Sequence, residues 1–430
     1  MEQQFIELCK LGKLEVAKWL FENNPTIDIY ADHKEAFRYA CENGHLEVAK
    51  WLLEVKPDID ISVYNEYPFR MACENSHLEV TKWLLEIKPD IDISDEDDYV
   101  FRYACQNGHL EVAKWLLTTK SDIDISAEYE YAFRYACQNG HLAVAKWLLE
   151  QKSDINISLW NEEAFRVACK YGHLDIAKWL LTTKSDIDIS IWNEEPFRVA
   201  CKYGHLDIAK WLLITKSDID ISAKDISGKN EDAFLLACEN GHLEVAQWLY
   251  SVKPIINISA ENEEAFRWAC ENGHLEVAQW LLKVKSDINI SADNEYAFCW
   301  ACRFGHLEVA QWLYQIKPDI DISAKDEEAF RWACRFGHLE VAQWLYQIKP
   351  DINISAKDEE VFSNACRNGY LEVAQWLYQI KPDINISVYD EYGFSWACRN
   401  GNLKVAKWLQ SLNPDKYHLE IVDDKTVICD

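Results

Sequence analysis

The chain has 430 residues, of which 49% are hydrophobic and 27% are charged, as expected for a packed, soluble protein. Its formal net charge of −28 disfavours nucleic acids and anionic membranes as partners, because both are bound through lysine and arginine. No stretch approaches the ~18 apolar residues of a membrane-spanning helix, and the first residues contain no apolar leader segment. We therefore expect a cytoplasmic protein whose fifteen cysteines are free thiols.

One tryptophan marks each copy of a repeat that runs along the chain. The step between copies is 32 residues, except for a step of 37 that contains five extra residues near 226–230. A fixed period of about 20–50 residues is typical of a solenoid, in which each repeat buries its apolar face against its neighbours. We therefore predict one long array and expect these tryptophans to pack between repeats. They are Trp19, Trp51, Trp83, Trp115, Trp147, Trp179, Trp211, Trp248, Trp280, Trp312, Trp344, Trp376 and Trp408.

The sequence pattern of each repeat predicts a helix, a tight turn, a second helix and an extended segment. Residues 327–336 have apolar side chains at helical spacing, and residues 338–346 carry a wider apolar stripe. Gly337 separates the two helices, because glycine readily takes a positive φ. Residues 349–355 alternate polar and apolar side chains. Helices this short are marginal alone, so stacking must stabilise them.

The last residues, 415–430, depart from the repeat. The segment YHLEIVDDKTVICD predicts two short strands around Asp423 and Asp424. An array has open apolar ends, so we expect this tail to be a hairpin that caps residues 1–414.

Three segments of the repeat match the signatures of a known family. GHLEVAKWLL (44–53) matches a second helix, PFRVAC (196–201) stands where the family has Pro-Leu-His-x-Ala-Ala, and DINIS (154–158) stands at its Asp-Val-Asn turn. The chain thus resembles ankyrin-repeat proteins over residues 1–414. The amino-acid sequence of its repeats is most similar to those of the expanded arrays of giant viruses and protists. The resemblance implies an all-α solenoid of about thirteen helix–turn–helix repeats with extended finger loops. A viral origin would place the protein in the host cytoplasm.

The repeats also depart from the family. The glycine after the second helix is replaced, usually by lysine as in Lys56, and arginine takes the place of the family's first-helix histidine. We expect these arginines, called here the recurrent arginines, to pair with the acidic loop residues beside them. They are Arg38, Arg70, Arg102, Arg134, Arg166, Arg198, Arg267 and Arg331.

Cysteine and histidine recur at fixed places, as in Cys41 and His45. One of each per repeat cannot complete a tetrahedral zinc site, and ten copies of one nucleophile–base pair are implausible. We therefore predict cysteine in the core, and the resemblance implies that histidine bonds backbone at the turn between helices. Cys299 and Cys302 form a C-x-x-C in mid-helix, outside the context of a redox motif. We expect no catalytic site, no metal site and no cofactor.

The triplet Asn-Ile-Ser recurs and fits a glycosylation sequon, but other repeats read Asp-Ile-Ser at the same place. The asparagine of this triplet is better interpreted as a turn residue. The resemblance raises Asn156 as a further candidate, because ankyrin asparagines at this position are targets of asparaginyl hydroxylase.

Two sets of variable positions carry aromatic side chains, and the resemblance implies that both line a concave groove that binds protein partners. The loop tips hold Tyr64, Tyr67, Tyr129, Tyr131, Trp160 and Trp192. The positions before the Gly-His pairs hold Tyr171, Tyr203, Phe304 and Phe336. Aromatic side chains are enriched at interface hot spots, which favours binding. The alternative is that these rings only cover neighbouring loops.

Beside the second set, charge changes from Glu42 through Lys170 to Arg303 and Arg335. This pattern predicts a groove that meets acidic parts of a partner near the two arginines; drift after duplication is the alternative. The sequence therefore predicts a monomeric, non-enzymatic scaffold for a protein partner. Its rivals are a structural or repertoire protein without a fixed ligand, and an adaptor to a ubiquitin ligase. The adaptor needs a C-terminal box domain, for which the 16 residues of 415–430 leave no room.

Overall fold

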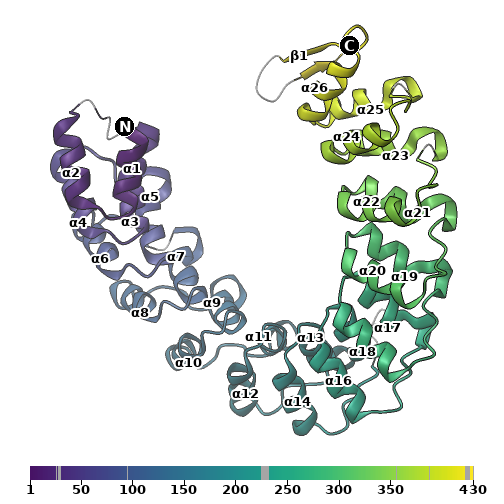
Figure 1. Ribbon diagram of the computed structural model, residues 1–430. Helices are drawn as coiled ribbons and strands as arrows, with labels where there is room; N and C mark the ends of the chain where they lie inside the picture. Colours follow the sequence, from purple (N-terminus) through teal and green to yellow (C-terminus); the bar gives the residue numbers. More distant parts are fainter. Residues whose placement is uncertain are drawn as a thin grey trace. The chain divides into compact units, whose positions relative to one another are not determined.

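The structure is a computed structural model that describes residues 1–25, 27, 31–93, 95–223, 232–354, 356–386, 388–421 and 427–429. This part of the chain contains 26 helices, arranged as successive antiparallel pairs, and one two-stranded hairpin (Figure 1). The prediction of an all-α solenoid of helix–turn–helix repeats is therefore confirmed. The five extra residues near 226–230 lie outside the described residues.

The helices alternate between a first and a second helix of each repeat. The first helices are α1 (Glu2–Lys10), α3 (Ala31–Glu42), α5 (Val63–Glu74), α7 (Asp95–Gln106), α9 (Ala127–Gln138), α11 (Leu159–Lys170), α13 (Ile191–Lys202), α15 (Ala233–Glu239), α17 (Ala260–Glu271), α19 (Ala292–Arg303), α21 (Ala324–Arg335), α23 (Ala356–Arg367) and α25 (Val388–Arg399). The second helices are α2 (Leu14–Asn23), α4 (Leu46–Val55), α6 (Leu78–Ile87), α8 (Leu110–Thr119), α10 (Leu142–Gln151), α12 (Leu174–Thr183), α14 (Leu206–Thr215), α16 (Leu243–Val252), α18 (Leu275–Val284), α20 (Leu307–Ile316), α22 (Leu339–Ile348), α24 (Leu371–Ile380) and α26 (Leu403–Leu412).

The helix pairs form two compact units. The N-terminal unit comprises Met1–Ala200 and Asp207–Ile219, and the C-terminal unit comprises Cys201–Leu206 and Asp220–Asp430. Each unit is by itself a stack in which first helices contact first helices of the neighbouring repeats, as α7 contacts α9 and α17 contacts α19.

The core repeats the same small set of side chains. In α9 and α10, Phe133, Cys137 and Leu148 are each 0% exposed. Complete burial of a phenylalanine or leucine contributes about 1.5–3 kcal/mol. The prediction that the periodic cysteine is a core residue is confirmed, and burial raises the pKa of the Cys9 thiol to about 12. The expectation that all cysteines are free is wrong for Cys398, which is disulfide-bonded.

The periodic tryptophans join successive repeats, as predicted, but the prediction is wrong for Trp19 in the first repeat, which is 62% exposed. The ring of Phe133 on α9 lies 6.2 Å from that of Trp179 on the second helix of the next repeat. The same pair recurs at Phe298 and Trp344, also at 6.2 Å. Each tilted aromatic pair adds about 0.5–1.5 kcal/mol beyond the area that it buries. A short helix pair is thus stabilised mainly by its neighbours.

The histidine at each inter-helix turn bonds the preceding repeat, as the resemblance implied. Nε2 of His45 donates to the carbonyl oxygen of Lys10 at 2.9 Å, and His109 makes the same bond to Glu74 at 2.7 Å. These carbonyls lie at the ends of first helices, where no intrahelical donor is available. The histidine therefore satisfies a helix end and sets the spacing between repeats.

The residue before each inter-helix histidine has a positive φ, and it is glycine in every case but one, where Ser76 has a φ of 68°; two features favour the glycine. Gly273 has a φ of +80°, and a Cβ there would lie 2.5 Å from Nδ1 of His306 in the next repeat. Gly401 has a similar φ of +73° but nothing within 4 Å of a Cβ. The sequence Gly-His therefore encodes both the turn and the fit between repeats.

The lysine after the second helix does not need the left-handed conformation that glycine supplies elsewhere. Lys56 has φ −135° and ψ 81°, and Asn413 at the last repeat has φ −144°. Any residue can adopt these angles. The lysine side chain can instead bond the preceding loop, as Lys88 does with Ser62 and Glu66.

The tail folds into an antiparallel hairpin of β1 (Leu419–Ile421) and β2 (Val427–Cys429). The hairpin contacts α25 and α26, and the buried ring of Tyr417 stacks on Phe394 at 4.4 Å. That residues 415–430 serve as the cap of the array stays a prediction. None of the described helices is long and apolar enough to cross a membrane.

We predict that Gly273→Ala destabilises the turn more than Gly401→Ala does. Both changes place an alanine at positive φ, but only Gly273→Ala also forces its Cβ against His306. Overpacking of this kind costs about 1–3 kcal/mol. Amide hydrogen exchange measures the free energy of local opening. The loss of this free energy in α17–α20 of Gly273→Ala should exceed the loss in α25 and α26 of Gly401→Ala by that amount. Equal losses at the two sites would show that the histidine contact adds nothing.

We also predict that the histidines make stability depend on pH. Burial is the main cause that lowers the pKa of His306, followed by repulsion from His274 and His338. The unfolded value is about 6.5. The lowered pKa therefore costs no stability above about pH 6.5. As pH falls below this value, the unfolded chain binds the proton more readily than the folded chain, and the free energy of unfolding decreases.

The test compares the wild type with His306→Asn, since Asn402 makes the equivalent bond to the Arg367 carbonyl at 2.8 Å in the last repeat. Between about pH 7.5 and 5.5, the wild type should lose more local stability around α19 and α20 than the variant. The difference between the two proteins cancels the effect of the other titrating groups. Parallel pH profiles in hydrogen exchange would contradict the prediction.

Candidate protein-interaction surface

The tip of each loop is a left-handed turn built mostly without glycine. In α11 the turn comprises Trp160, Asn161 and Glu162, with φ values of 50°, 57° and 61°. Seven turns among the described residues have three such residues in succession. Each non-glycine residue in this region costs about 1–2 kcal/mol. The strained turn of α11 follows the segment 152–158, which is the part of the repeat predicted as extended.

The middle position of these turns follows the residue preference of the left-handed region. Asparagine and aspartate tolerate this conformation best after glycine. The seven middle residues are Asn65, Tyr129, Asn161, Asn193, Asn262, Asn294 and Asp326. Tyr129 is therefore the exception among them, and its presence at this place has no explanation in backbone preference.

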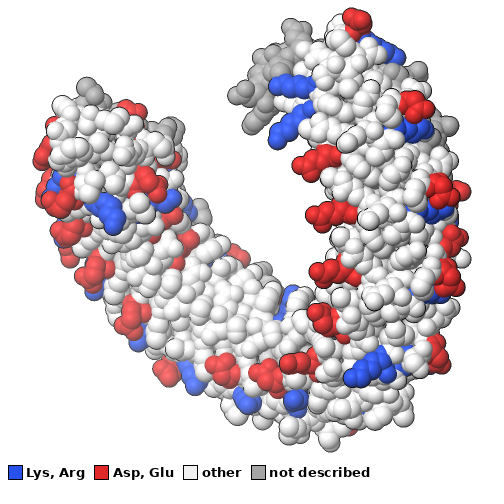
Figure 2. All heavy atoms as spheres, viewed as in Figure 1, with Lys and Arg blue, Asp and Glu red and all other residues white. Residues whose placement is uncertain are grey.

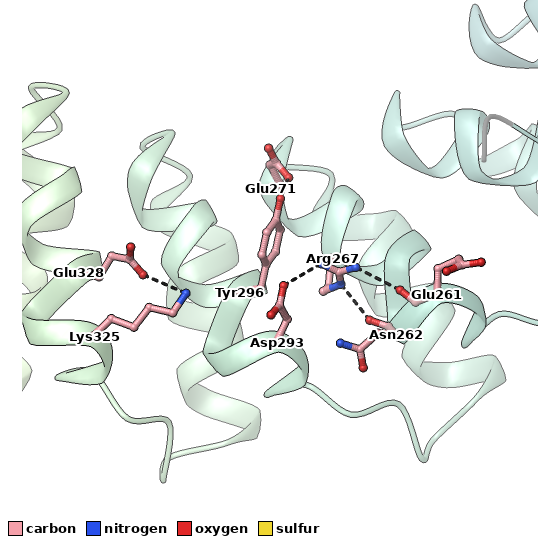
Figure 3. Close-up of polar contacts among 8 residues, drawn as sticks. All are labelled: Glu261, Asn262, Arg267, Glu271, Asp293, Tyr296, Lys325 and Glu328. Atoms are coloured by element: carbon pink, nitrogen blue, oxygen red, sulfur yellow. Dashed lines mark hydrogen bonds and ion pairs between the residues drawn. The ribbon is translucent and has the colours of Figure 1, made fainter. Parts of the chain in front are cut away.

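The recurrent arginines stabilise these turns through their carbonyl oxygens. Nε of Arg267 donates to Asn262 O at 2.8 Å and Nη2 donates to Glu261 O at 3.1 Å, as Figure 3 shows. Arg198 makes the same pair of bonds at 2.9 and 3.1 Å. One planar guanidinium thus bonds two successive carbonyls that the left-handed turn aims in one direction.

Among the described residues, four of the eight recurrent arginines also pair with carboxylates of the next repeat, as predicted. Nη1 of Arg267 lies 3.5 Å from Oδ2 of Asp293 (Figure 3). The other pairs of this kind are Arg134 with Glu163 at 2.6 Å, Arg166 with Glu195 at 3.0 Å and Arg331 with Glu360 at 3.5 Å. These contacts tie each strained turn to its neighbour.

Four of the predicted tip residues are largely exposed in the N-terminal unit: Tyr129 (66%), Tyr64 (50%), Trp160 (49%) and Trp192 (38%). The rings of Tyr129 and Trp160 lie 5.6 Å apart, although they belong to successive repeats. The guanidinium of Arg134 lies 4.1 Å from the Trp160 ring centre, and Arg166 lies 4.1 Å from Trp192. These rings are therefore held by cation–π contacts on one side and remain exposed on the other.

Tyr67 and Tyr131 do not lie at the tips. Each directly follows the left-handed turn and is half-buried against the preceding first helix. Their hydroxyl groups donate to Glu42 and Gln106, and the Tyr131 ring also stacks on Tyr135 at 4.1 Å. Tyr296 bonds Glu271 at 2.6 Å in the same way (Figure 3). These tyrosines therefore join successive repeats.

The second predicted set lies at or just after the ends of the first helices. Tyr171, Tyr203 and Phe304 are 45%, 42% and 45% exposed, whereas Phe336 is half-buried. Tyr171 belongs to the N-terminal unit and the other three belong to the C-terminal unit.

In the C-terminal unit, Phe304 and Phe336 belong to an aromatic cluster that the sequence analysis did not identify. Trp300 on α19 lies 5.7 Å from Phe304 and 5.3 Å from Trp332 on α21. The Arg303 guanidinium lies 4.2 Å from the Trp300 ring centre and 4.6 Å from that of Trp332. The sequence could have indicated this cluster. The position of Trp300 in the repeat is a further variable position, and it is aromatic in several repeats, as at Tyr135.

The Asp-Ile-Ser and Asn-Ile-Ser triplets form turns, as interpreted from sequence. The backbone N–H of Ser126 donates to Oδ1 of Asp124 at 3.0 Å, and Ser259 makes the same bond to Asn257 at 3.2 Å. Both side chains supply the same oxygen, so the two triplets are interchangeable. Asn156 is exposed, and its hydroxylation stays a prediction.

Acidic side chains recur along both units on the face shown in Figure 2, with lysine and arginine among them. Among the described residues, no three His, Cys, Asp or Glu side chains are placed to hold a metal ion. The exposed side chains that stand out from the repeat are therefore the aromatic ones at the tips and at the first-helix ends.

Comparison with known sequences agrees with this architecture. The family described as "Ankyrin repeats (3 copies)" matches residues 5–97, 58–129, 101–193, 133–225 and 197–292. The family described as "Ankyrin repeats (many copies)" matches residues 298–346 and 330–378. A search of curated proteins finds no match. With these matches along most of its length and with stacked helix pairs in both units, the chain belongs to the ankyrin-repeat family.

Proposed function

We propose that the protein is an interaction scaffold that binds a protein partner through the exposed aromatic tips of its N-terminal unit. Tyr129, Trp160 and Trp192 form this tip surface. Ankyrin repeats are generally protein–protein interaction modules, and aromatic side chains are the most frequent hot spots of such interfaces. No catalytic role is proposed for any residue of the chain.

The observation that carries the proposal is the placement of Tyr129. It is 66% exposed and occupies a left-handed position, at φ 57°, where other turns have asparagine or aspartate. Strain and an exposed apolar ring both cost free energy, and residues of this kind concentrate at functional sites. A ring that contacts a partner accounts for both costs.

The rival proposal is a structural protein without a fixed ligand. It is supported by the contacts of Arg134 with Trp160 and of Arg166 with Trp192, through which the tips stabilise the array itself. Tyr129 separates the two proposals, because its backbone position favours another residue. For the wider setting, we propose a cytoplasmic monomer, in keeping with the thirteen free cysteines of the described residues.

We predict that Tyr129→Asn weakens partner binding without weakening the fold. Asparagine suits the left-handed position, and the loss of one ring contact with Trp160 offsets at most about 1 kcal/mol of that gain. Loss of a hot spot reduces affinity about tenfold or more. Affinity capture from lysate, followed by titration of the captured protein, measures the binding, and thermal unfolding measures the fold.

The matched control is Asn294→Asp, a change at the same turn position to the residue that Asp326 already supplies. It should bind as the wild type does. Equal binding by the wild type, Tyr129→Asn and Asn294→Asp would favour the structural rival. A lower melting temperature for Tyr129→Asn would show that the tyrosine serves the fold.

A further inference from the structure

The C-terminal unit carries a second row of arginines with a different environment from the recurrent arginines. The last residues of α19, α21, α23 and α25 are Arg303, Arg335, Arg367 and Arg399. We call these the stripe arginines. The repeat places them at equivalent positions, so they follow one another along the first helices of this unit. In the N-terminal unit the same position is varied, as at Glu74, Gln106 and Lys170.

We propose that the stripe arginines and the adjoining tryptophans bind an extended acidic peptide segment of a partner protein. This inference rests on the proposed protein-binding function, but it concerns a different surface from the tips of the N-terminal unit. The argument has three parts: the lack of an ion pair at Arg303, Arg335 and Arg399 within the described residues, the fixed backbone and the spacing.

The first part is the contrast between the two arginine rows. Recurrent arginines such as Arg134 and Arg267 pair with carboxylates of the next repeat. Among the described residues, no carboxylate forms an ion pair with Arg303, Arg335 or Arg399. This holds although the chain has a net charge of −28. The charge of these side chains is therefore available to a carboxylate from outside.

The guanidinium groups rest instead on aromatic faces. Arg303 lies against both Trp300 and Trp332, at 4.2 and 4.6 Å from their ring centres, and its Nε is buried without a hydrogen-bond partner among the described residues. Arg367 lies 4.5 Å from the Trp396 ring centre. Stacking on a ring holds an arginine in place and leaves the donors at the edge of the guanidinium directed outward.

The second part is the backbone under the stripe. The Arg335 carbonyl accepts a hydrogen bond from Asn368 at 2.9 Å, and the Arg367 carbonyl accepts one from Asn400 at 2.9 Å. Each donor belongs to the next repeat, so successive helix ends are linked to one another. A surface that is fixed before binding loses less conformational freedom when a ligand arrives.

The third part is spacing. Packed helices lie about 8–10 Å apart, and a chain in the extended polyproline II conformation rises about 3.1 Å per residue with three residues per turn, so one repeat corresponds to three residues and every third side chain lies on the same face. Glutamate or aspartate at every third residue would therefore meet successive stripe arginines. Apolar residues between them would lie on Trp300 and Trp332. A helix C-terminus also favours a cation, but the same position is glutamate at the ends of α3 and α5, so the helix does not require one.

The test measures the binding of a labelled synthetic peptide to the full-length chain by fluorescence anisotropy. The probe carries glutamate at every third residue, and the comparison peptide has the same composition with its glutamates adjacent. We expect the probe to bind at least about tenfold more tightly than the comparison peptide, and we expect its affinity to fall as salt screens the ion pairs.

The variant for this test is Arg335→Gln with Arg399→Gln, because both side chains are exposed and glutamine already ends α7 and α9. We expect the probe to bind about tenfold more weakly, since two charge-assisted contacts are lost. The control, Lys283→Gln with Lys404→Gln, makes the same change of charge on exposed positions of second helices and should bind as the wild type does. Arg335→Lys with Arg399→Lys should keep most of the binding, which excludes a general folding defect.

Three results would overturn the inference: equal binding of the two peptides, unchanged binding by the glutamine variant, or tighter binding of a single-stranded RNA than of the probe. The Tyr129→Asn variant should bind the probe normally. If the probe fails while partner capture still depends on Tyr129, only the stripe inference fails. If capture shows no dependence on Tyr129 while the stripe binds the probe, the tip surface fails and the stripe stands.

Discussion

The fit between successive repeats is the constraint on which the rest of the structure depends. A single pair of short helices cannot bury its apolar face, so every repeat relies on the phenylalanine, tryptophan and histidine contacts of its neighbours. Gly273 and His306 show how strictly this fit is set, because no side chain can be added between them. The spacing that results places the same position of every repeat at a regular interval, which is what allows rows of side chains to act together.

Arginine has two roles in this arrangement, and its neighbours decide which. Arg267 bonds the carbonyls of a strained turn and a carboxylate of the next repeat, so its charge is used within the fold. Arg303 contacts two tryptophan rings and forms no ion pair among the described residues. The residues of the strained turns also differ in role. Asparagine at most middle positions suits the left-handed backbone conformation, whereas Tyr129 does not. Function is therefore best sought where a residue departs from what the repeat requires.

Much of the candidate surface could be predicted from sequence, and its failures have physical causes. The exposed rings of Trp160 and Trp192 were expected at loop tips, and the pairing of Arg166 with an acidic neighbour was expected too. Tyr131 was wrongly grouped with the tips, because a left-handed turn directly before it directs its side chain toward the preceding helix. No spacing rule predicts three successive left-handed residues without glycine. The cluster around Trp300 and Trp332 was missed because the position of Trp300 was not among the variable positions considered, although it is aromatic in several repeats.

The sequence by itself determined the repeat, its helical pairs, its buried cysteines and its histidine turns, because a pattern copied thirteen times can satisfy only one way of stacking. Tertiary structure alone decided which arginines are used inside the fold, which aromatic rings remain exposed and that Cys398 is not free. These properties depend on contacts between neighbouring repeats or with the tail. The period gives the order of such contacts, but their distances and directions follow from how the helices pack.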